Sequence, residues 1–306
     1  MSQALTRHIY GHKLLSVAVA LAILSLLYLT EPWNLLTPRL KIEGNPMSLI
    51  YVFAASESEA RPVQRMMARY KDDRSQLDLG RIAKNDVALF LTGIGPRAAK
   101  ASASSALNGV APPHGFETRR PDAVLIIGVC GSLTPAIPEG EVIVYSACLS
   151  TQNDKSQLPT TQPLAKRVST LLNARGIVSR PAVGITSRRV ATNQQQKLEL
   201  AKSGAQVVDM ESYEIIAEAT QAGLPVLVIR TVSDALDRKM PDFNLALDEQ
   251  GDLNSFKALR VCIGSPILWA QVSLSSRRAV RRLGSALQVM LSEESLLTKP
   301  PLNSPR

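Results

Sequence analysis

Cysteine and histidine are scarce in this chain of 306 residues, which contains three of each. The cysteines are Cys130, Cys148 and Cys262, and the histidines are His8, His12 and His114. An odd number of widely separated cysteines cannot all pair, and neither residue type shows the spacing of metal ligands. The sequence therefore predicts reduced thiols in the protein core and no metal site.

Aromatic and acidic residues are also in short supply. Aromatic residues make up 4% of the chain, and 26 acidic residues face 35 basic ones, which gives a net charge of +9. This surplus favours binding to anionic surfaces. No nucleic-acid partner is expected, because no aromatic side chain is interleaved with the basic cluster near the C-terminus. That cluster is either a solvated helix face or a contact for anionic lipid headgroups, and it consists of Arg277, Arg278, Arg281 and Arg282;.

One long apolar run without a charge, residues 14–30, lies near the N-terminus. As a helix it would extend about 26 Å, close to the lower limit for crossing a bilayer. Arg7 and Lys13 precede it and no small-residue cleavage motif follows, so residues 1–46 are expected to form an uncleaved membrane anchor and linker;. The alternative is that translation starts at Met47, which would give a soluble cytoplasmic protein.

The remainder of the chain alternates between short apolar runs and segments with helical periodicity. Strands are expected at 49–54, 87–91, 123–127, 141–145, 206–209 and 225–232, and helices at 57–70, 96–107, 212–222 and in a last segment ending near 291;. This alternation predicts an α/β fold, a single three-layer domain with a mixed, mostly parallel central sheet flanked by helices. The domain is expected to span residues 47–292, followed by a disordered tail at 293–306.

Two carboxylates follow two of the expected strands. Glu211 comes after the strand at 206–209, and Asp234 comes after the strand at 225–232. Open α/β sheets bind ligands at the carboxyl ends of their strands. An acid at such a place, beside apolar surface, either grips a polar ligand or holds a proton for transfer. Taken singly, each acid could equally be a helix cap or a solvated loop residue.

Together, residues 207–212 and 226–234 resemble the signature of the purine nucleoside phosphorylase and methylthioadenosine/S-adenosylhomocysteine nucleosidase superfamily. Residues 52–59, 91–96 and 126–132 match further segments in the same order. The resemblance implies an enzyme that cleaves the N-glycosidic bond of a purine nucleoside of the adenosine type. The site residues that it implies are Met210 and Glu211 for the ribose, Ser233 and Asp234 for the purine, and Gly93, Gly128 and Val129 around the sugar and the nucleophile.

The nucleophile distinguishes a hydrolase from a phosphorylase. Phosphate is usually bound by arginine together with hydroxyls and amides. The resemblance places the usual arginine and serine of the phosphorylases at positions that are Ile126 and Val129 here. The usual phosphate ligands are therefore missing, although a phosphate site could still be rebuilt from Arg97, Arg188 and Arg189.

The same resemblance makes Glu59 the base that activates water and Asp234 the group that protonates the purine or hydrogen-bonds to it. Glu57 is better explained as an acid that complements the dipole of the helix that follows it. Hydrolysis is thus the first expectation and phosphorolysis the alternative. No metal or organic cofactor is expected, and phosphate is a possible co-substrate.

A closer resemblance is to the hopanoid-associated phosphorylases, a subgroup associated with removal of adenine from adenosylhopane. It is carried by residues 128–131, 189–192, 208–212, 239–251 and 264–266. It implies a lipid-linked nucleoside substrate. The apolar run at 14–30 makes a single-pass protein of the inner membrane the expectation, and nucleosides and reduced thiols favour a cytoplasmic catalytic domain. We also expect a homo-oligomer. The alternative of another class is a membrane-tethered nucleoside sensor without catalysis.

Overall fold

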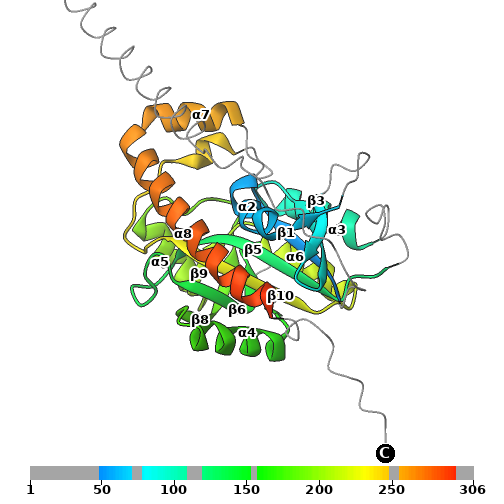
Figure 1. The fold of residues 1–306 in the computed structure, drawn as a ribbon. Helices are drawn as coiled ribbons and strands as arrows, with labels where there is room; N and C mark the ends of the chain where they lie inside the picture. The colour runs from blue at the N-terminus through cyan, green and yellow to red at the C-terminus, as the bar shows by residue number, and fades with distance from the viewer. Residues whose placement is uncertain (1–47, 71–77, 109–118, 153–156, 248–254, 294–306) are drawn as a thin grey trace, which may run out of the picture.

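The strand β1 (Ser48–Ala54) has an interior position in the sheet of the computed structural model (Figure 1). It pairs in parallel with β4 (Asn85–Leu91) on one side and with β5 (Ala123–Ser132) on the other. Every residue of β1 is buried. Its sequence is almost uninterruptedly apolar because a strand covered on both faces has no solvent side. The structure describes residues 48–70, 78–108, 119–152, 157–247 and 255–293.

The strands beyond β5 close on one another. The strand β10 (Val226–Asp234) pairs in parallel with β5 and antiparallel with β6 (Val142–Ser150). From β6 the sheet continues to β8 (Ser179–Thr186) and then to β9 (Val207–Asp209), which returns to β5 in antiparallel pairing. The strands β5, β9, β8, β6 and β10 therefore form a closed ring.

The other strands lie outside this ring. On the far side of β1, the sheet continues from β4 to β3 (Asp78–Ile82) and β2 (Ala68–Arg69), both in antiparallel pairings. The short strand β7 (Leu158–Pro159) pairs with β6. The longest pairings of the sheet, those of β1 with β4, of β5 with β10 and of β6 with β8, are all parallel.

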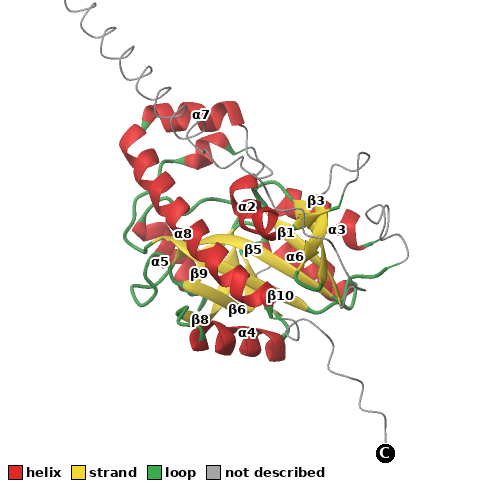
Figure 2. Cartoon of the chain, in the orientation of Figure 1, coloured by secondary structure: helices red, strands yellow, loops and turns green. Residues whose placement is uncertain are grey.

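Helices cover both faces of the sheet, as Figure 2 shows. They are α2 (Glu57–Met66), α3 (Pro96–Leu107), α4 (Gln162–Ala174), α5 (Gln194–Ala201), α6 (Ser212–Gln221), α7 (Ser255–Gly264), α8 (Pro266–Ser292) and the short 3-10 helix η1 (Phe243–Ala246).

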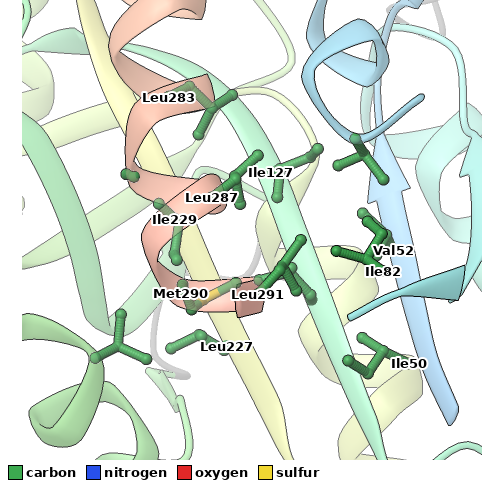
Figure 3. Packing of buried hydrophobic residues seen from close by; sticks show 14 of the residues in the cluster. Ile50, Val52, Ile82, Ile127, Leu227, Ile229, Leu283, Leu287, Met290 and Leu291 are labelled. Atoms are coloured by element: carbon green, nitrogen blue, oxygen red, sulfur yellow. The ribbon is translucent and has the colours of Figure 1, made fainter. Parts of the chain in front are cut away.

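Alternate residues of β1 enter two different hydrophobic cores. Ile50 and Val52 lie in the core that also includes side chains of α2, α4 and α8. Figure 3 shows Leu287 of α8 in this core. Tyr51 and Phe53 point to the opposite face and lie in the core shared with α3 and α6. Because successive side chains of a strand point to opposite faces, the two cores follow directly from the apolar run of β1.

The structure confirms the predicted α/β class, the mixed sheet and the three layers, and it corrects the helix expected at 57–70. That helix ends at Met66, and Ala68 and Arg69 form the strand β2, paired with Arg81 and Gly80 of β3. The strand β2 forms because it pairs with β3, a later segment of the chain, and the hydrophobic periodicity of residues 57–70 alone does not predict this pairing.

The predicted anchor at 14–30 lies outside the described residues, as does the predicted tail at 293–306 except for its first residue, Glu293. Within the described ranges, no helix combines the length and the apolar character that a membrane crossing requires.

Candidate active site

Three buried carboxylates gather at one end of the parallel strands. Glu59 lies in the first turn of α2, just after β1, and Asp234 is the last residue of β10. Glu211 follows β9, which runs antiparallel to β5 with Val208 opposite Gly131. All three side chains are buried. Buried carboxylates require partners, because an isolated ionised group in a protein interior is strongly unfavourable.

Arg230 is the shared partner of Glu59 and Glu211. It lies in the middle of β10 and its side chain is 2% exposed. Its Nη2 donates to Glu211 Oε2 at 3.2 Å, and its Nη1 lies 3.9 Å from Glu59 Oε1. Its Nε lies 3.6 Å from Asp209 Oδ2. One guanidinium therefore faces three carboxylates. The pKa of Arg230 is raised because these acids outweigh the effect of burial, so the side chain stays charged.

Glu59 is held with its carboxylate toward the end of β5. The backbone N–H of Val129 donates to Glu59 Oε1 at 2.8 Å. On the other oxygen, the backbone N–H and the hydroxyl of Ser56 donate to Oε2 at 3.2 and 3.1 Å. Glu57, two residues earlier, is exposed and accepts a hydrogen bond from Gln64. The structure thus separates the two acids as the sequence analysis did, with Glu59 inside the cluster and Glu57 outside it.

Glu211 is an acid of this cluster whose pKa is raised. Burial raises its pKa to about 7, with further raising by Asp209 and Glu59, while Arg230 and the Gly95 amide act in the opposite direction. The Gly95 N–H donates to Glu211 Oε1 at 3.1 Å. A carboxyl group with this pKa exchanges its proton near neutral pH, which suits a group that hydrogen-bonds to sugar hydroxyls.

Asp209 supports this cluster from behind. Tyr145 donates to its Oδ2 at 2.9 Å and Thr186 to its Oδ1 at 2.7 Å. The backbone N–H groups of Glu211 and Ser212 also donate to Oδ1. Although burial alone would raise the pKa of Asp209, Arg230 and these hydrogen bonds lower it. Asp209 therefore remains a carboxylate that fixes both Arg230 and the start of α6.

Asp234 has a cation of its own. The ammonium of Lys197, from α5, donates to Asp234 Oδ2 at 2.6 Å, and the Lys197 side chain is fully buried. The same ammonium donates to the carbonyl of Ala235. Ser233 donates its hydroxyl to Asp234 Oδ1 at 2.7 Å. Both carboxylate oxygens are thus oriented by neighbouring groups.

Two glycines in β5 make room for these side chains. A Cβ at Gly128 would lie 2.5 Å from Glu59 Oε1 and would also clash with the guanidinium of Arg230. A Cβ at Gly131 would lie 2.7 Å from Asp234 Oδ2. Any other residue at either position would displace an acid, so the glycines serve the close approach of side chains to the β5 backbone.

The structure brings most of the predicted site residues together. Glu59, Glu211, Asp234 and Ser233 lie in the cluster, and the N–H and C=O of Val129 bond to Glu59 and Arg230. The remaining two predicted residues, Met210 and Gly93, each lie within two residues of a group that belongs to the cluster. Met210 is half-buried beside Glu211, and Gly93 begins the turn that presents the Gly95 amide, with a φ of +80°.

The residues considered for phosphate binding are either buried and apolar or exposed on the surface. Ile126 is buried in the core and has no polar side-chain atom to offer. The three arginines that could replace the usual ligands, Arg97, Arg188 and Arg189, all have exposed side chains.

Three buried residues of the site were missed in the sequence. They are Lys197, Asp209 and Arg230. The sequence position of Arg230 could have indicated its role. A cation inside an apolar β-branched strand is expected to be buried, and charged residues are rarely buried without a partner. No such indication exists for Lys197, because it lies in the polar helix sequence Gln194–Ala201, where a lysine is normally solvated. Neither side chain could be assigned to a carboxylate without the fold.

A ring of strands with buried acids at its carboxyl ends defines an α/β protein with a site for a small polar molecule. The chain belongs to the phosphorylase superfamily, whose family model matches residues 53–258. A search of curated protein sequences returned no match.

Solved structures share the fold at low identity. The methylthioadenosine/S-adenosylhomocysteine nucleosidase of Neisseria meningitidis is 15% identical, with a TM-score of 0.60 over 80% of this chain and 99% of that one. The S-adenosylhomocysteine nucleosidase of Streptococcus pyogenes is also 15% identical, with a TM-score of 0.60 over 82% and 98%. The futalosine hydrolase of Helicobacter pylori is 16% identical, with a TM-score of 0.57 over 79% and 97%.

Proposed function

We propose that this protein hydrolyses the N-glycosidic bond of a purine nucleoside. The observation that carries the proposal is the placement of Glu59. Its buried carboxylate is fixed by the Val129 amide and Ser56, and it lies in the same cluster as Glu211. A fixed carboxylate beside a sugar-binding acid is suited to take a proton from water. The similar folds of two nucleosidases and a futalosine hydrolase support the same reaction class.

The proposed reaction breaks the bond between the anomeric carbon and the purine nitrogen, and the bonding pair leaves with the purine. Water attacks the anomeric carbon as Glu59 takes one of its protons. Asp234 hydrogen-bonds to the imidazole ring of the leaving purine or protonates it. Glu211 hydrogen-bonds to the ribose hydroxyls and, with Glu59, adds negative charge near a sugar that becomes cationic in the transition state.

Phosphorolysis is the competing function within the same family. The side chain of Ile126 cannot bind an anion, and the Val129 amide already donates to Glu59. Both features favour water over phosphate as the nucleophile. The deciding experiment follows adenine release from adenosine derivatives by the purified protein, with and without phosphate. Hydrolysis predicts turnover in phosphate-free buffer and free ribose as the product, whereas strict dependence on phosphate would establish a phosphorylase. Tight binding without adenine release would indicate a sensor.

We further propose that the nucleoside is linked to a lipid of the hopanoid type. The support is the resemblance of residues 128–131, 189–192 and 208–212 to the hopanoid-associated subgroup, together with the apolar run at 14–30. An enzyme that is anchored in the bilayer meets a bilayer-embedded substrate far more often than a freely diffusing enzyme does. This proposal also places the protein at the inner membrane.

A truncated chain tests the role of the anchor. Starting the chain at Met47 should spare cleavage of a soluble adenosine analogue and impair cleavage of a lipid-linked one in liposomes. The measured quantity is the ratio of the two rates for the full-length and truncated proteins. An unchanged ratio would remove the anchor from substrate access.

A further inference from the structure

A helical arm with little burial extends from the domain. It comprises α7 and the first turns of α8, residues 255–274, and we refer to it as the apolar arm. Figure 1 shows it beyond the sheet at the top of the view, while the last turns of α8 lie across the strands. From 257 to 274 none of the described side chains is buried, whereas α8 buries Ser275 and six later residues. The arm therefore takes little part in the core.

Apolar side chains are nevertheless concentrated on the arm. Among the described residues, seven large hydrophobic side chains are exposed, and three of them belong to the arm. Ile263 is 37% exposed, Ile267 is 73% exposed and Leu274 is 52% exposed. A fourth, Leu245, belongs to η1, which packs against α7. Exposed apolar side chains that cluster on one element mark an interaction surface.

The helices α7 and α8, which include the apolar arm, have basic but no acidic residues. Between Ser255 and Ser292 the sequence has six basic residues and no aspartate or glutamate. Four of the six form the arginine cluster Arg277, Arg278, Arg281 and Arg282, whose side chains are exposed. The cluster lies on α8 immediately after the arm.

The order along α8 is apolar first and basic second. At 1.5 Å per residue, Arg278 lies roughly 16 Å along the helix from Ile267, and Leu274 lies between them. These three positions are seven and four residues apart and share one face of the helix. Trp269, a residue type that favours the boundary between water and lipid, lies in the apolar portion;.

We propose that the apolar arm inserts into the interface of a bilayer that contains anionic lipids. The arm would enter the boundary of the acyl chains, to the depth of about 5–10 Å that is usual for amphipathic helices. The arginine cluster would then lie among the anionic headgroups. A bilayer suits this surface better than a second copy of the chain does, because two copies would place like-charged clusters close together. The inference does not depend on which bond the enzyme cleaves.

The fluorescence of Trp269 provides a direct test. The chain has two tryptophans, Trp33 and Trp269, so the substitution Trp33→Phe leaves one reporter in the otherwise full chain. The protein is placed in vesicles of phosphatidylcholine alone or with phosphatidylglycerol, each prepared with and without brominated acyl chains. We expect bromine to quench Trp269 in the anionic vesicles, and to quench it less in the neutral ones or at high salt, where charges are screened.

Variants separate the apolar and electrostatic parts. The double substitution Ile267→Ser with Leu274→Ser should reduce quenching at least twofold. The matched control is Val178→Ser with Leu198→Ser, two exposed apolar residues outside the arm, which should leave quenching unchanged. Replacing Arg278, Arg281 and Arg282 by glutamine should abolish the difference between anionic and neutral vesicles, because each arginine near an anionic surface contributes about fivefold to partitioning.

Three results would overturn the proposal. The first is the absence of quenching in anionic vesicles. The second is equal quenching in the arm variant and its matched control. The third is a blue shift of Trp269 fluorescence that increases with protein concentration without lipid, which would assign the arm to contact between copies of the chain. Far-ultraviolet circular dichroism, measured on the same samples, checks that every variant is folded.

Discussion

The pair formed by Lys197 and Asp234 allows a quantitative prediction. Replacing Lys197 by methionine keeps most of the side-chain volume but removes the ammonium that lies 2.6 Å from Asp234 Oδ2. Lys197 is fully buried and the Asp234 side chain is 9% exposed, so solvent cannot replace the lost cation. Removing one partner of a buried ion pair costs about 3–5 kcal/mol. We expect Lys197→Met to lower the free energy of unfolding by this amount.

Urea unfolding near neutral pH measures the loss, and two further variants identify its origin. Lys202→Met is the matched control, because Lys202 pairs with Glu199 at the same helix, and both of these side chains are about 70% exposed. Exposed pairs of this kind contribute about 0.5 kcal/mol or less. The double variant Lys197→Met with Asp234→Asn removes the uncompensated charge and should recover roughly 2 kcal/mol relative to Lys197→Met.

The same substitution should also affect catalysis. Without Lys197, Asp234 loses the group that fixes Oδ2, and a misplaced catalytic group can lower the rate on the order of 100-fold. We therefore expect Lys197→Met to reduce kcat more than it changes KM. A loss of stability below about 1 kcal/mol, together with wild-type kcat, would refute the view that this pair orients the acid.

Four other predictions concern the carboxylates and the glycine that lies against Glu59. Asp234→Asn should slow the chemical step by a factor on the order of 100 or more while binding suffers less, as measured by single-turnover adenine release. Burial raises the pKa of Glu211 to about 7, so this group becomes a carboxylate, which accepts hydrogen bonds from ribose hydroxyls, as the pH rises through neutrality. Binding of an uncleavable nucleoside analogue should therefore strengthen over this pH range. In Glu211→Gln the affinity should not change with pH over the same range. The same shift should lower the stability of the ligand-free protein as the pH rises from the ordinary value of 4.5 to about 7, because the folded state then retains a proton that the unfolded state has lost;. Gly128→Ala should lower both stability, by about 1–3 kcal/mol, and activity, since its Cβ would displace Glu59; wild-type values in urea unfolding and in the activity assay would show that the site can yield;.

Much of the fold could be predicted from the sequence because its central strands are buried on both faces. The run at 49–54 is apolar without interruption, and the run at 225–232 is apolar apart from Arg230 and Thr231, which made both visible as strands; β1 and β10 occupy these positions. The strand β8 was missed because its sequence contains Arg180, Pro181 and Gly184. Gly184 is required there, since a Cβ would collide with the ring of Tyr145 from the neighbouring strand β6. Such a requirement arises only after the strands have been paired.

The three acids could be predicted, but the partners that control them could not. Glu59, Glu211 and Asp234 follow strands, and the superfamily resemblance linked them to one another. The cations that accompany them reach the site from different directions. Arg230 lies inside a strand, and Lys197 extends from a helix that the sequence analysis did not predict. Their roles depend on contacts between residues far apart in the chain, such as the 37 positions that separate Lys197 from Asp234.

The distribution of these cations explains how four acids can be buried in one site and still differ in their surroundings. Arg230 is shared by Glu59, Glu211 and Asp209, so its single positive charge is divided among three carboxylates. Asp209 has the additional hydrogen bonds that lower its pKa, and Glu211, with fewer donors, has a raised pKa. Asp234 has Lys197 for itself. The surroundings of one shared arginine thus lower the pKa of Asp209 and leave that of Glu211 raised, so two neighbouring acids of one site have different proton affinities;.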